Sequence, residues 1–154
     1  MPGALQREIK QSKPFRSLQA EAFLNIQKTA DALSQAMDAE LKPHGISQTQ
    51  YNVLRILRGA EPDGLPCREI AARMVAHDPD ITRLLDRLET RNFVVRTREE
   101  KDRRVILTRI TRAGLQLLDE LDEPLYALLD RLLGHLGIQK LKNLIELLEL
   151  ARAS

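Results

Sequence analysis

Apolar residues in the first third of the chain follow the period of a helix. From Pro14 to about residue 45 they recur in steps of three and four, at Phe23, Ile26, Ala30, Leu33, Met37 and Leu41. This spacing places them in a single stripe along one long helix, and Pro43-His44-Gly45 ends that helix. Residues 1–13 are polar and aperiodic, so we predict a flexible arm before a helical segment at 14–45.

Two shorter helices are expected next, and their boundaries are well marked. Ser47 and Gln50 form a capping box, and Gly59 follows the apolar positions Val53, Leu54 and Leu57. A polar turn at residues 61–64 then leads to a short helix from about Cys67. The residues predicted to face inward from this helix are Ile70, Ala71 and Met74.

The following helix has an acidic start. Asp78 is a suitable N-cap, Pro79 fits the first helical position, and Asn92 tolerates the left-handed conformation that ends many helices. The predicted buried face consists of Ile81, Leu84, Leu85 and Leu88. The predicted exposed face consists of Asp80, Thr82, Arg83, Asp86, Arg87 and Thr90.

The pattern then changes from helical to extended. Residues 93–98 and 105–110 are rich in β-branched side chains, and they flank the polar segment 99–104. Two such runs around a polar tip predict a β-hairpin, which is the one strand pair that we expect in the chain.

The C-terminal third returns to helical spacing and is dominated by leucine. Thr111 is a suitable N-cap for a helix in which Leu115, Leu118, Leu121, Leu125, Leu128 and Leu132 recur, and Pro124 is expected to kink it. A last helix starts at about Ile138. Of the 27 leucines in the chain, 15 lie in its last 42 residues.

The last helix is too apolar for a helix that covers only one side of a small domain. We therefore predict a homodimer that is built from the N- and C-terminal helices and is isologous by symmetry. The alternative is an intramolecular helical bundle without a dimer. The residues expected at the dimer interface are Phe23, Ile26, Leu141, Leu144, Ile145 and Leu148.

These elements predict a mainly α fold with a small β-hairpin. A helix, a turn, a second helix and a hairpin in this order are typical of a winged helix-turn-helix protein, in which the hairpin is the wing. We expect this lobe at residues 46–110, the N-terminal dimerisation helix at 14–45 and C-terminal dimerisation helices at 111–154.

Charge becomes informative only when it is divided by segment. The whole chain carries a formal net charge of +2. Residues 96–112 hold seven basic and three acidic side chains, a net charge of +4, whereas residues 113–154 have a net charge of −3. A basic hairpin tip suits insertion into a DNA minor groove, where negative potential is focused.

Composition excludes several other functions. The chain has five aromatic residues and no Trp, too few for the stacking platforms of single-strand binders. A single cysteine, Cys67, and the lack of a signal peptide or an apolar run of membrane-spanning length indicate a cytoplasmic protein. We find no catalytic constellation, no metal-ligand spacing around His44, His77 or His135, and no cofactor motif, so an enzyme is not expected.

The predicted second helix and wing supply the candidate DNA contacts. Residues near the start of the helix can reach base edges in the major groove. The Arg83 guanidinium can donate two hydrogen bonds to O6 and N7 of guanine. The candidate residues of the recognition helix are Pro79, Asp80, Thr82, Arg83 and Arg87. Those of the wing are Arg98, Lys101, Asp102, Arg103 and Arg104.

At the hairpin the sequence resembles MarR-type transcriptional regulators. The resemblance rests on Lys101-Asp102-Arg103-Arg104, on the segments 105–107 and 110–114, and on the two predicted helices at 69–71 and 81–89. It implies a dimeric repressor or activator that binds a pseudopalindromic duplex. It further implies that Asp102 holds the Arg104 guanidinium for the minor groove, and that a small molecule or a redox signal acts near the junction of the dimer helices and the DNA-binding lobe.

The sequence departs from the family pattern at three places. Asn92 stands where glycine is usual after the recognition helix, and the acidic opening 78–80 replaces one rich in Ser and Thr. Cys67 begins the helix that precedes the recognition helix and does not lie in the N-terminal helix, where the peroxide-sensing branch carries its thiol. This position disfavours a thiol-based redox sensor. The favoured function is a DNA-binding regulator; the alternative is a helical protein-interaction adaptor that does not bind DNA.

Overall fold

The computed structural model describes residues 3–153; Met1 and Pro2 of the expected arm, and Ser154, lie outside the described part. The fold is mainly helical with one small antiparallel sheet, which confirms the predicted class. The elements are α1 (Ala4–Glu8), α2 (Leu18–Leu41), the 3-10 helix η1 (Lys42–His44), α3 (Gln48–Arg58), β1 (Leu65–Pro66), α4 (Cys67–Arg73), α5 (Ile81–Thr90), β2 (Val94–Arg98), β3 (Ile106–Ile110), α6 (Arg112–Leu133), the 3-10 helix η2 (Gly134–Leu136) and α7 (Gly137–Arg152).

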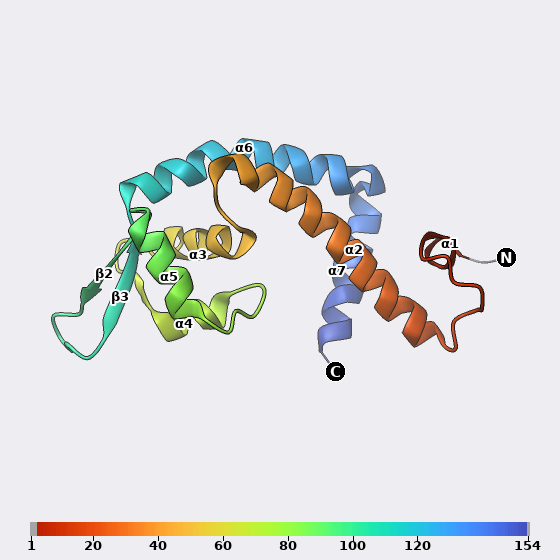
Figure 1. Ribbon diagram of the computed structural model, residues 1–154, viewed down its shortest axis with the longest axis horizontal. Coiled ribbons are helices and arrows are strands. Elements are labelled where there is room, and N and C mark those ends of the chain that lie inside the picture. The colour runs from red at the N-terminus through yellow and green to blue at the C-terminus, as the bar shows by residue number, and fades with distance from the viewer. Residues whose placement is uncertain (1–2, 154) are drawn as a thin grey trace.

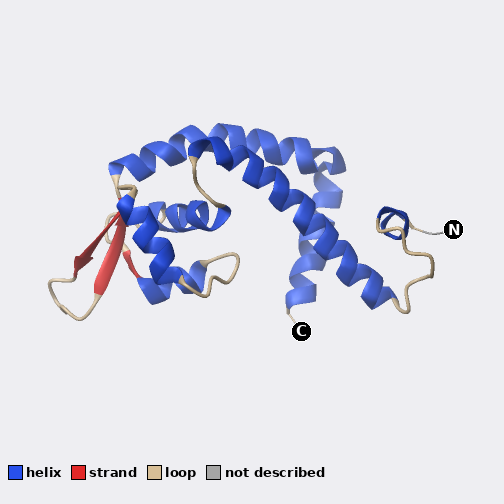
Figure 2. Ribbon diagram, viewed as in Figure 1, coloured by secondary structure: helices blue, strands red, loops and turns tan. Residues whose placement is uncertain are grey.

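The elements form a small lobe and a group of long helices. Figure 1 shows α3, α4, α5 and the hairpin gathered at one end of the molecule, while α6 arches from that lobe to α7 at the other end. Helix α2 runs from the lobe toward α1, and it packs against α3 and α6. The strands occur only at the lobe end of the described chain (Figure 2).

Several predicted boundaries are confirmed in atomic detail. The Ser47 hydroxyl accepts a hydrogen bond from the Gln50 amide at 3.1 Å, and the Gln50 side chain accepts one from the Ser47 amide at 3.0 Å, which completes the capping box before α3. Thr111 caps α6 by accepting from the Gly114 amide at 3.1 Å. Asn92 has φ +62°, so it supplies the left-handed turn between α5 and β2.

The predicted start of α5 was wrong by two residues. Asp80, not Asp78, is the N-cap: its carboxylate accepts a hydrogen bond from the Arg83 amide at 3.1 Å. The Asp78 carboxylate instead accepts from the Asp80 amide at 2.8 Å, which closes a local turn around Pro79. Two aspartates on either side of a proline offer two possible caps, and in this turn Pro79 lies ahead of the helix.

Two short elements were not predicted from the sequence. The segment expected as a loose arm contains α1, which holds the buried Leu5, and α2 begins only after its cap Ser17, four residues beyond Pro14. Strand β1 adds a third strand to the predicted pair, since Leu65 pairs with Thr108 in the sheet order β1-β3-β2. A two-residue strand is too short to give a periodic signal.

The core is aliphatic and joins the lobe to the long helices. Leu54 of α3, Leu85 and Leu88 of α5, and Leu118 and Leu121 of α6 are almost completely buried in one cluster. Ala71 of α4 is exposed, contrary to the predicted inward orientation, because the short helix buries chiefly Ile70. Helix α6 passes through Pro124 without interruption. Among residues 3–153, no helix combines the length and the apolar character needed to cross a bilayer.

Gly114 is the point of closest approach between α6 and the hairpin. A Cβ atom there would lie 2.5 Å from the Phe93 carbonyl oxygen and 2.6 Å from Cγ1 of Ile110. Gly114→Ala is therefore expected to lower the free energy of unfolding by about 1–3 kcal/mol, measured by urea denaturation. Gly59→Ala is the matched control, because its Cβ would meet nothing closer than 3.5 Å and its φ is −72°. Equal stability of the two variants would contradict this account.

Candidate nucleic-acid interface

Helix α5 presents a polar face to solvent because its apolar face is fixed in the core. Leu84, Leu85 and Leu88 are buried. The residues left exposed are Thr82, Arg83, Asp86, Arg87 and Thr90, as the sequence predicted. Pro79 and Asp80 are exposed as well, but they lie in the turn before the helix and not in its first turn. All the candidate residues of the predicted recognition helix thus lie on or next to one outward surface.

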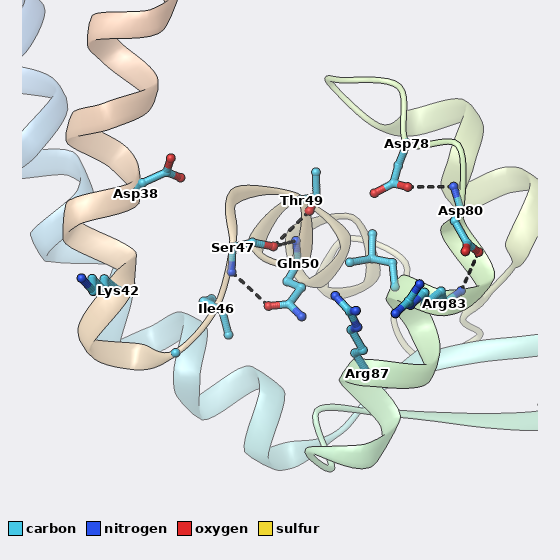
Figure 3. A pocket seen from close by; sticks show the side chains of 12 residues that line it. Asp38, Lys42, Ile46, Ser47, Thr49, Gln50, Asp78, Asp80, Arg83 and Arg87 are labelled. Carbon is cyan, nitrogen blue, oxygen red and sulfur yellow. Dashed lines mark hydrogen bonds between the residues drawn. The ribbon is translucent and has the colours of Figure 1, made fainter.

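A broad depression of about 860 Å³ lies beside this surface, between the end of α2, the start of α3 and the start of α5. Its walls carry charges of both signs: Asp38 and Lys42 lie on the side of α2, and Asp78, Asp80, Arg83 and Arg87 lie on the side of α5 and the turn before it (Figure 3). Two of these carboxylates, Asp78 and Asp80, already accept backbone hydrogen bonds in the turn before α5. The arginines project from α5 into the depression (Figure 3).

The hairpin tip is ordered by hydrogen bonds within the wing. Strands β2 and β3 pair from Val94 with Ile110 to Arg98 with Ile106. Beyond the strands, the Glu99 amide donates to the Val105 carbonyl at 2.9 Å, and the Arg98 guanidinium donates to the Arg103 carbonyl at 2.8 Å. Arg98 therefore supports the tip from its base.

Asp102 and Arg104 form a two-pronged ion pair at the tip. Nε and Nη2 of Arg104 donate to the two carboxylate oxygens of Asp102 at 3.1 and 3.2 Å, and the Arg104 amide donates to the same carboxylate at 3.1 Å. The Arg104 guanidinium holds the pKa of the Asp102 carboxyl below its usual value. The Arg104 side chain is nevertheless 92% exposed, so it is oriented without being covered. Lys101 and Arg103 are also exposed beside it.

Arg96 of β2 joins the wing to α5, a role that no local sequence pattern predicts. Its Nη2 donates to Asp86 at 2.5 Å and to Glu89 at 2.9 Å, and its backbone amide donates to Glu89 at 3.1 Å. The Arg96 hydrogen bond lowers the pKa of Glu89, and the two carboxylates raise the pKa of Arg96. The candidate helix and the wing are therefore joined by side-chain hydrogen bonds.

Arg109 anchors the opposite strand of the wing and was also missed. Its guanidinium donates to the Pro62 carbonyl at 3.2 Å and to the Thr97 hydroxyl at 2.8 Å. Strand β3 is thereby connected both to β2 and to the turn that precedes β1. These partners are distant in the sequence, and only an alternation pattern could have placed Arg109 and Thr97 on one face.

The residues expected at a dimer interface lie on α2 and α7, away from the lobe. Phe23 is 59% and Ile26 is 47% exposed; Leu144 and Ile145 are exposed on α7, and Leu141 and Leu148 are half-buried. The apolar surface extends beyond the predicted set, to Leu18 at the start of α2 and to Ile138, Leu147 and Leu150 on α7.

Cys67 and the histidines do not form a site. Cys67 is half-buried at the start of α4, where it lines a smaller cavity of about 380 Å³ together with Thr82 and Arg96. Within the described range 3–153, no three His, Cys, Asp or Glu side chains are grouped closely enough to hold a metal ion.

The helix-turn-helix formed by α4 and α5, followed by the β2–β3 hairpin, defines a winged helix-turn-helix protein. Comparison with known proteins agrees: the family model described as the MarR family matches residues 46–106. The crystal structure of a MarR transcription factor from Planctomyces limnophilus is 42% identical, with a TM-score of 0.69, over 89% of this chain and 99% of that chain. The chain therefore belongs to the MarR family of transcriptional regulators.

Two further solved structures have a similar fold. CouR from Rhodococcus jostii RHA1, solved with p-coumaroyl-CoA bound, is 28% identical with a TM-score of 0.70, over 86% of this chain and 91% of that chain. A mutant MarR from E. coli, solved in complex with operator DNA, is 22% identical with a TM-score of 0.77, over 88% of this chain and 98% of that chain. At this lower identity, the E. coli structure shows a shared fold.

The Arg96–Glu89 link gives a pH prediction with a definite sign. Because the pKa of Glu89 is lowered in the folded protein, the link stabilises the fold above the ordinary carboxyl pKa of 4.5 and is lost as the pH falls through the lower folded value. Arg96→Gln is therefore expected to destabilise by up to about 1 kcal/mol at neutral pH and by less in acid. Denaturation at several pH values measures this difference.

The same variant is expected to raise the Glu89 titration midpoint, as followed by carboxyl NMR. Arg73→Gln is the matched control, since it removes a more exposed ion pair with Glu69 on α4 and leaves Glu89 untouched. A Glu89 midpoint that does not move in Arg96→Gln would rule out the link.

Proposed function

We propose that this protein binds duplex DNA as a homodimer, with α5 of each protomer in a major groove and the wing in the adjacent minor groove. The main support for this proposal is that a single lobe exposes arginines both on α5, at Arg83 and Arg87, and at the wing tip, at Arg104. Arginine can fork onto guanine in the major groove and favours the negative potential of a narrow minor groove.

The individual roles follow from this placement. Arg83 lies near the start of α5 and reaches base edges, whereas Arg87 lies one turn later and suits a phosphate. Thr82 contacts a thymine methyl group or a phosphate, and Asp80, beside the turn residue Pro79, offers an acceptor to a cytosine amino group. In the wing, Arg104 enters the minor groove while Arg98, Lys101, Asp102 and Arg103 orient it or meet phosphates.

Dimerisation follows from the apolar surfaces of α2 and α7. An exposed phenylalanine on α2 and exposed leucines and isoleucines on both α2 and α7 are typical of a subunit interface. A twofold dimer carries two identical lobes, and therefore binds an inverted repeat with half-sites about one helical turn apart. The segments 14–45 and 111–154 act as dimerisation helices, and 46–110 as the DNA-binding lobe.

The depression beside α5 suits a small-molecule effector. Its volume of about 860 Å³ lies within the range of ligand pockets, but it is an open depression lined mainly by polar and charged side chains, at the junction of α2 with the lobe. Since Arg83 and Arg87 line it, a molecule bound there competes with DNA for the same side chains. We propose further that the protein acts as a cytoplasmic regulator without enzymatic activity. Binding of duplex DNA is the property that distinguishes it from a protein-interaction adaptor.

Arg104→Ala is expected to weaken binding to a selected duplex by about 1–3 kcal/mol and to reduce the salt dependence of binding. Arg131→Ala is the control, because Arg131 is exposed on α6 in its last turn, far from the wing. Fluorescence anisotropy over a range of salt concentrations measures both quantities. Equal affinities of Arg104→Ala and the control would exclude Arg104 from the interface.

Asp102→Ala tests whether the Asp102 carboxylate acts by orienting Arg104 or only through its negative charge. Removal of a negative charge near DNA strengthens binding by electrostatics alone, whereas loss of the carboxylate that holds Arg104 weakens it. We expect weaker binding. Stronger binding would mean that the Asp102–Arg104 pair is only a surface ion pair.

Phe23→Glu combined with Ile145→Glu is expected to yield monomers in sedimentation experiments, because both residues are exposed on the proposed interface and buried carboxylates are costly. The monomer is expected to lose high affinity for a duplex with two half-sites. Val95→Glu, a change at an exposed apolar residue of the wing, serves as the control and leaves the dimer intact. Dimers that persist in the double variant would place the interface elsewhere.

A further inference from the structure

One arginine connects the end of the proposed recognition helix to the end of α2. Arg91 is the C-terminal cap residue of α5, and its guanidinium donates one hydrogen bond to the Gly45 carbonyl and a second, of 3.2 Å, to the His44 carbonyl. These carbonyls belong to the elbow formed by η1 and Gly45, where the chain leaves α2 and turns toward α3. The partners are 46 and 47 residues apart in the sequence.

The local structure is built around this contact. The Arg91 guanidinium lies over the Phe93 ring, with 4.8 Å from Cζ to the ring centroid. Gly45 has φ +69°, and a Cβ atom there would lie 3.3 Å from both terminal nitrogens of Arg91. Glycine at the elbow thus permits the left-handed turn and also leaves room for the guanidinium.

The chemistry of the contact requires arginine. The last carbonyls of a helix lack partners within the helix, and a planar guanidinium can donate to two of them at once while one face rests on an aromatic ring. Lysine offers a single point charge and cannot reproduce the fork.

The position of the contact gives it a consequence for DNA recognition. Helix α2 carries Phe23 and Ile26 of the proposed dimer surface in its first half, and its other end is the elbow held by Arg91. In a twofold dimer, the distance between the two recognition helices decides which half-site spacing fits. A link that holds α5 to α2 therefore helps to set the distance between the two recognition helices of the dimer.

We propose that Arg91 is a positioning residue that sets the half-site spacing the dimer accepts, by holding α5 against the end of α2. This inference rests on the proposed function. The competing role is a direct one: Arg91 is exposed, and an exposed arginine can also bind a phosphate.

The test compares Arg91→Lys and Arg91→Ala with the wild-type protein on one set of duplexes. The probe is a duplex selected by the wild-type protein from random DNA, together with versions in which one or two base pairs are added or removed between the half-sites. The wild type is expected to prefer its own spacing. Both variants are expected to lose about tenfold of that preference, since a coupling between two sites is typically of this size. Arg55→Ala, which removes an arginine stacked on Tyr51, is the matched control and keeps the preference.

The two roles of Arg91 predict different results for lysine. A phosphate contact tolerates lysine, so restored affinity in Arg91→Lys, with Arg91→Ala weakened equally at every spacing, would overturn the proposal. An unchanged spacing preference in both variants would overturn it as well.

A second measurement does not depend on DNA. In a Cys67→Ser background, spin labels at Ala39→Cys on α2 and Thr90→Cys on α5 report the distance between these helices, with unlabelled protein in excess so that distances within one chain dominate. Both positions are exposed. The distance distribution is expected to broaden in Arg91→Ala and Arg91→Lys and to stay narrow in Arg55→Ala. If the wild type binds no duplex, the proposed function fails, and the distance measurement alone tests whether Arg91 holds α5 against α2. Distributions in Arg91→Ala and Arg91→Lys that are as narrow as in the wild type would refute that role.

Discussion

The burial of one face of α5 is the constraint on which the rest of the site depends. Leu84, Leu85 and Leu88 fill a core that also contains α3 and α6, so the helix has one rotational setting about its own axis. Every polar residue on the opposite face then has a defined direction. The exposure of Arg83 and Arg87 is a result of leucine packing, and aliphatic burial thereby decides where the charges lie.

Aliphatic packing has little directional preference, so hydrogen bonds from arginines fix how the packed elements are oriented relative to one another. Arg58 of α3 donates to both oxygens of Asp122 on α6 at 2.9 and 3.1 Å, Arg96 holds the wing to α5, and Arg91 holds α5 to the elbow. Arg58 and Arg91 each use two nitrogens of the guanidinium for two acceptors, which fixes an angle as well as a distance, whereas Arg96 donates from Nη2 to two carboxylates. The arginines of this chain therefore fall into two groups: those that hold elements together, and those, such as Arg104, that remain available to a partner.

The features that could be predicted from the sequence are those encoded by neighbouring residues, and those that could not are contacts between distant parts of the chain. Periodicity predicted α3, α6, α7 and the hairpin, because each has an apolar pattern longer than one turn or a change of period, and the Ser47 and Thr111 caps are local signals. The Asp102–Arg104 pair, two residues apart, was implied by the resemblance to MarR-type regulators. Local signals failed at the start of α5, where two aspartates compete for one cap, and at β1, which has only two residues. Contacts such as that of Arg91 with His44 span 47 residues, and no local pattern encodes them.

Helix α2 links the two ends of the molecule (Figure 1). The exposed apolar residues of α2 lie several turns from the elbow, yet α2 is one uninterrupted helix of 24 residues, and such a helix transmits a displacement at one end to the other. The lobe is joined to this helix at the elbow, and it is joined to α6 both by Arg58 and by the leucine core that α3 and α5 share with α6. The depression between α2 and α5 borders the elbow at Gly45, so a displacement of α2 that moved the elbow would reach α5 through Arg91 and the wing through Arg96.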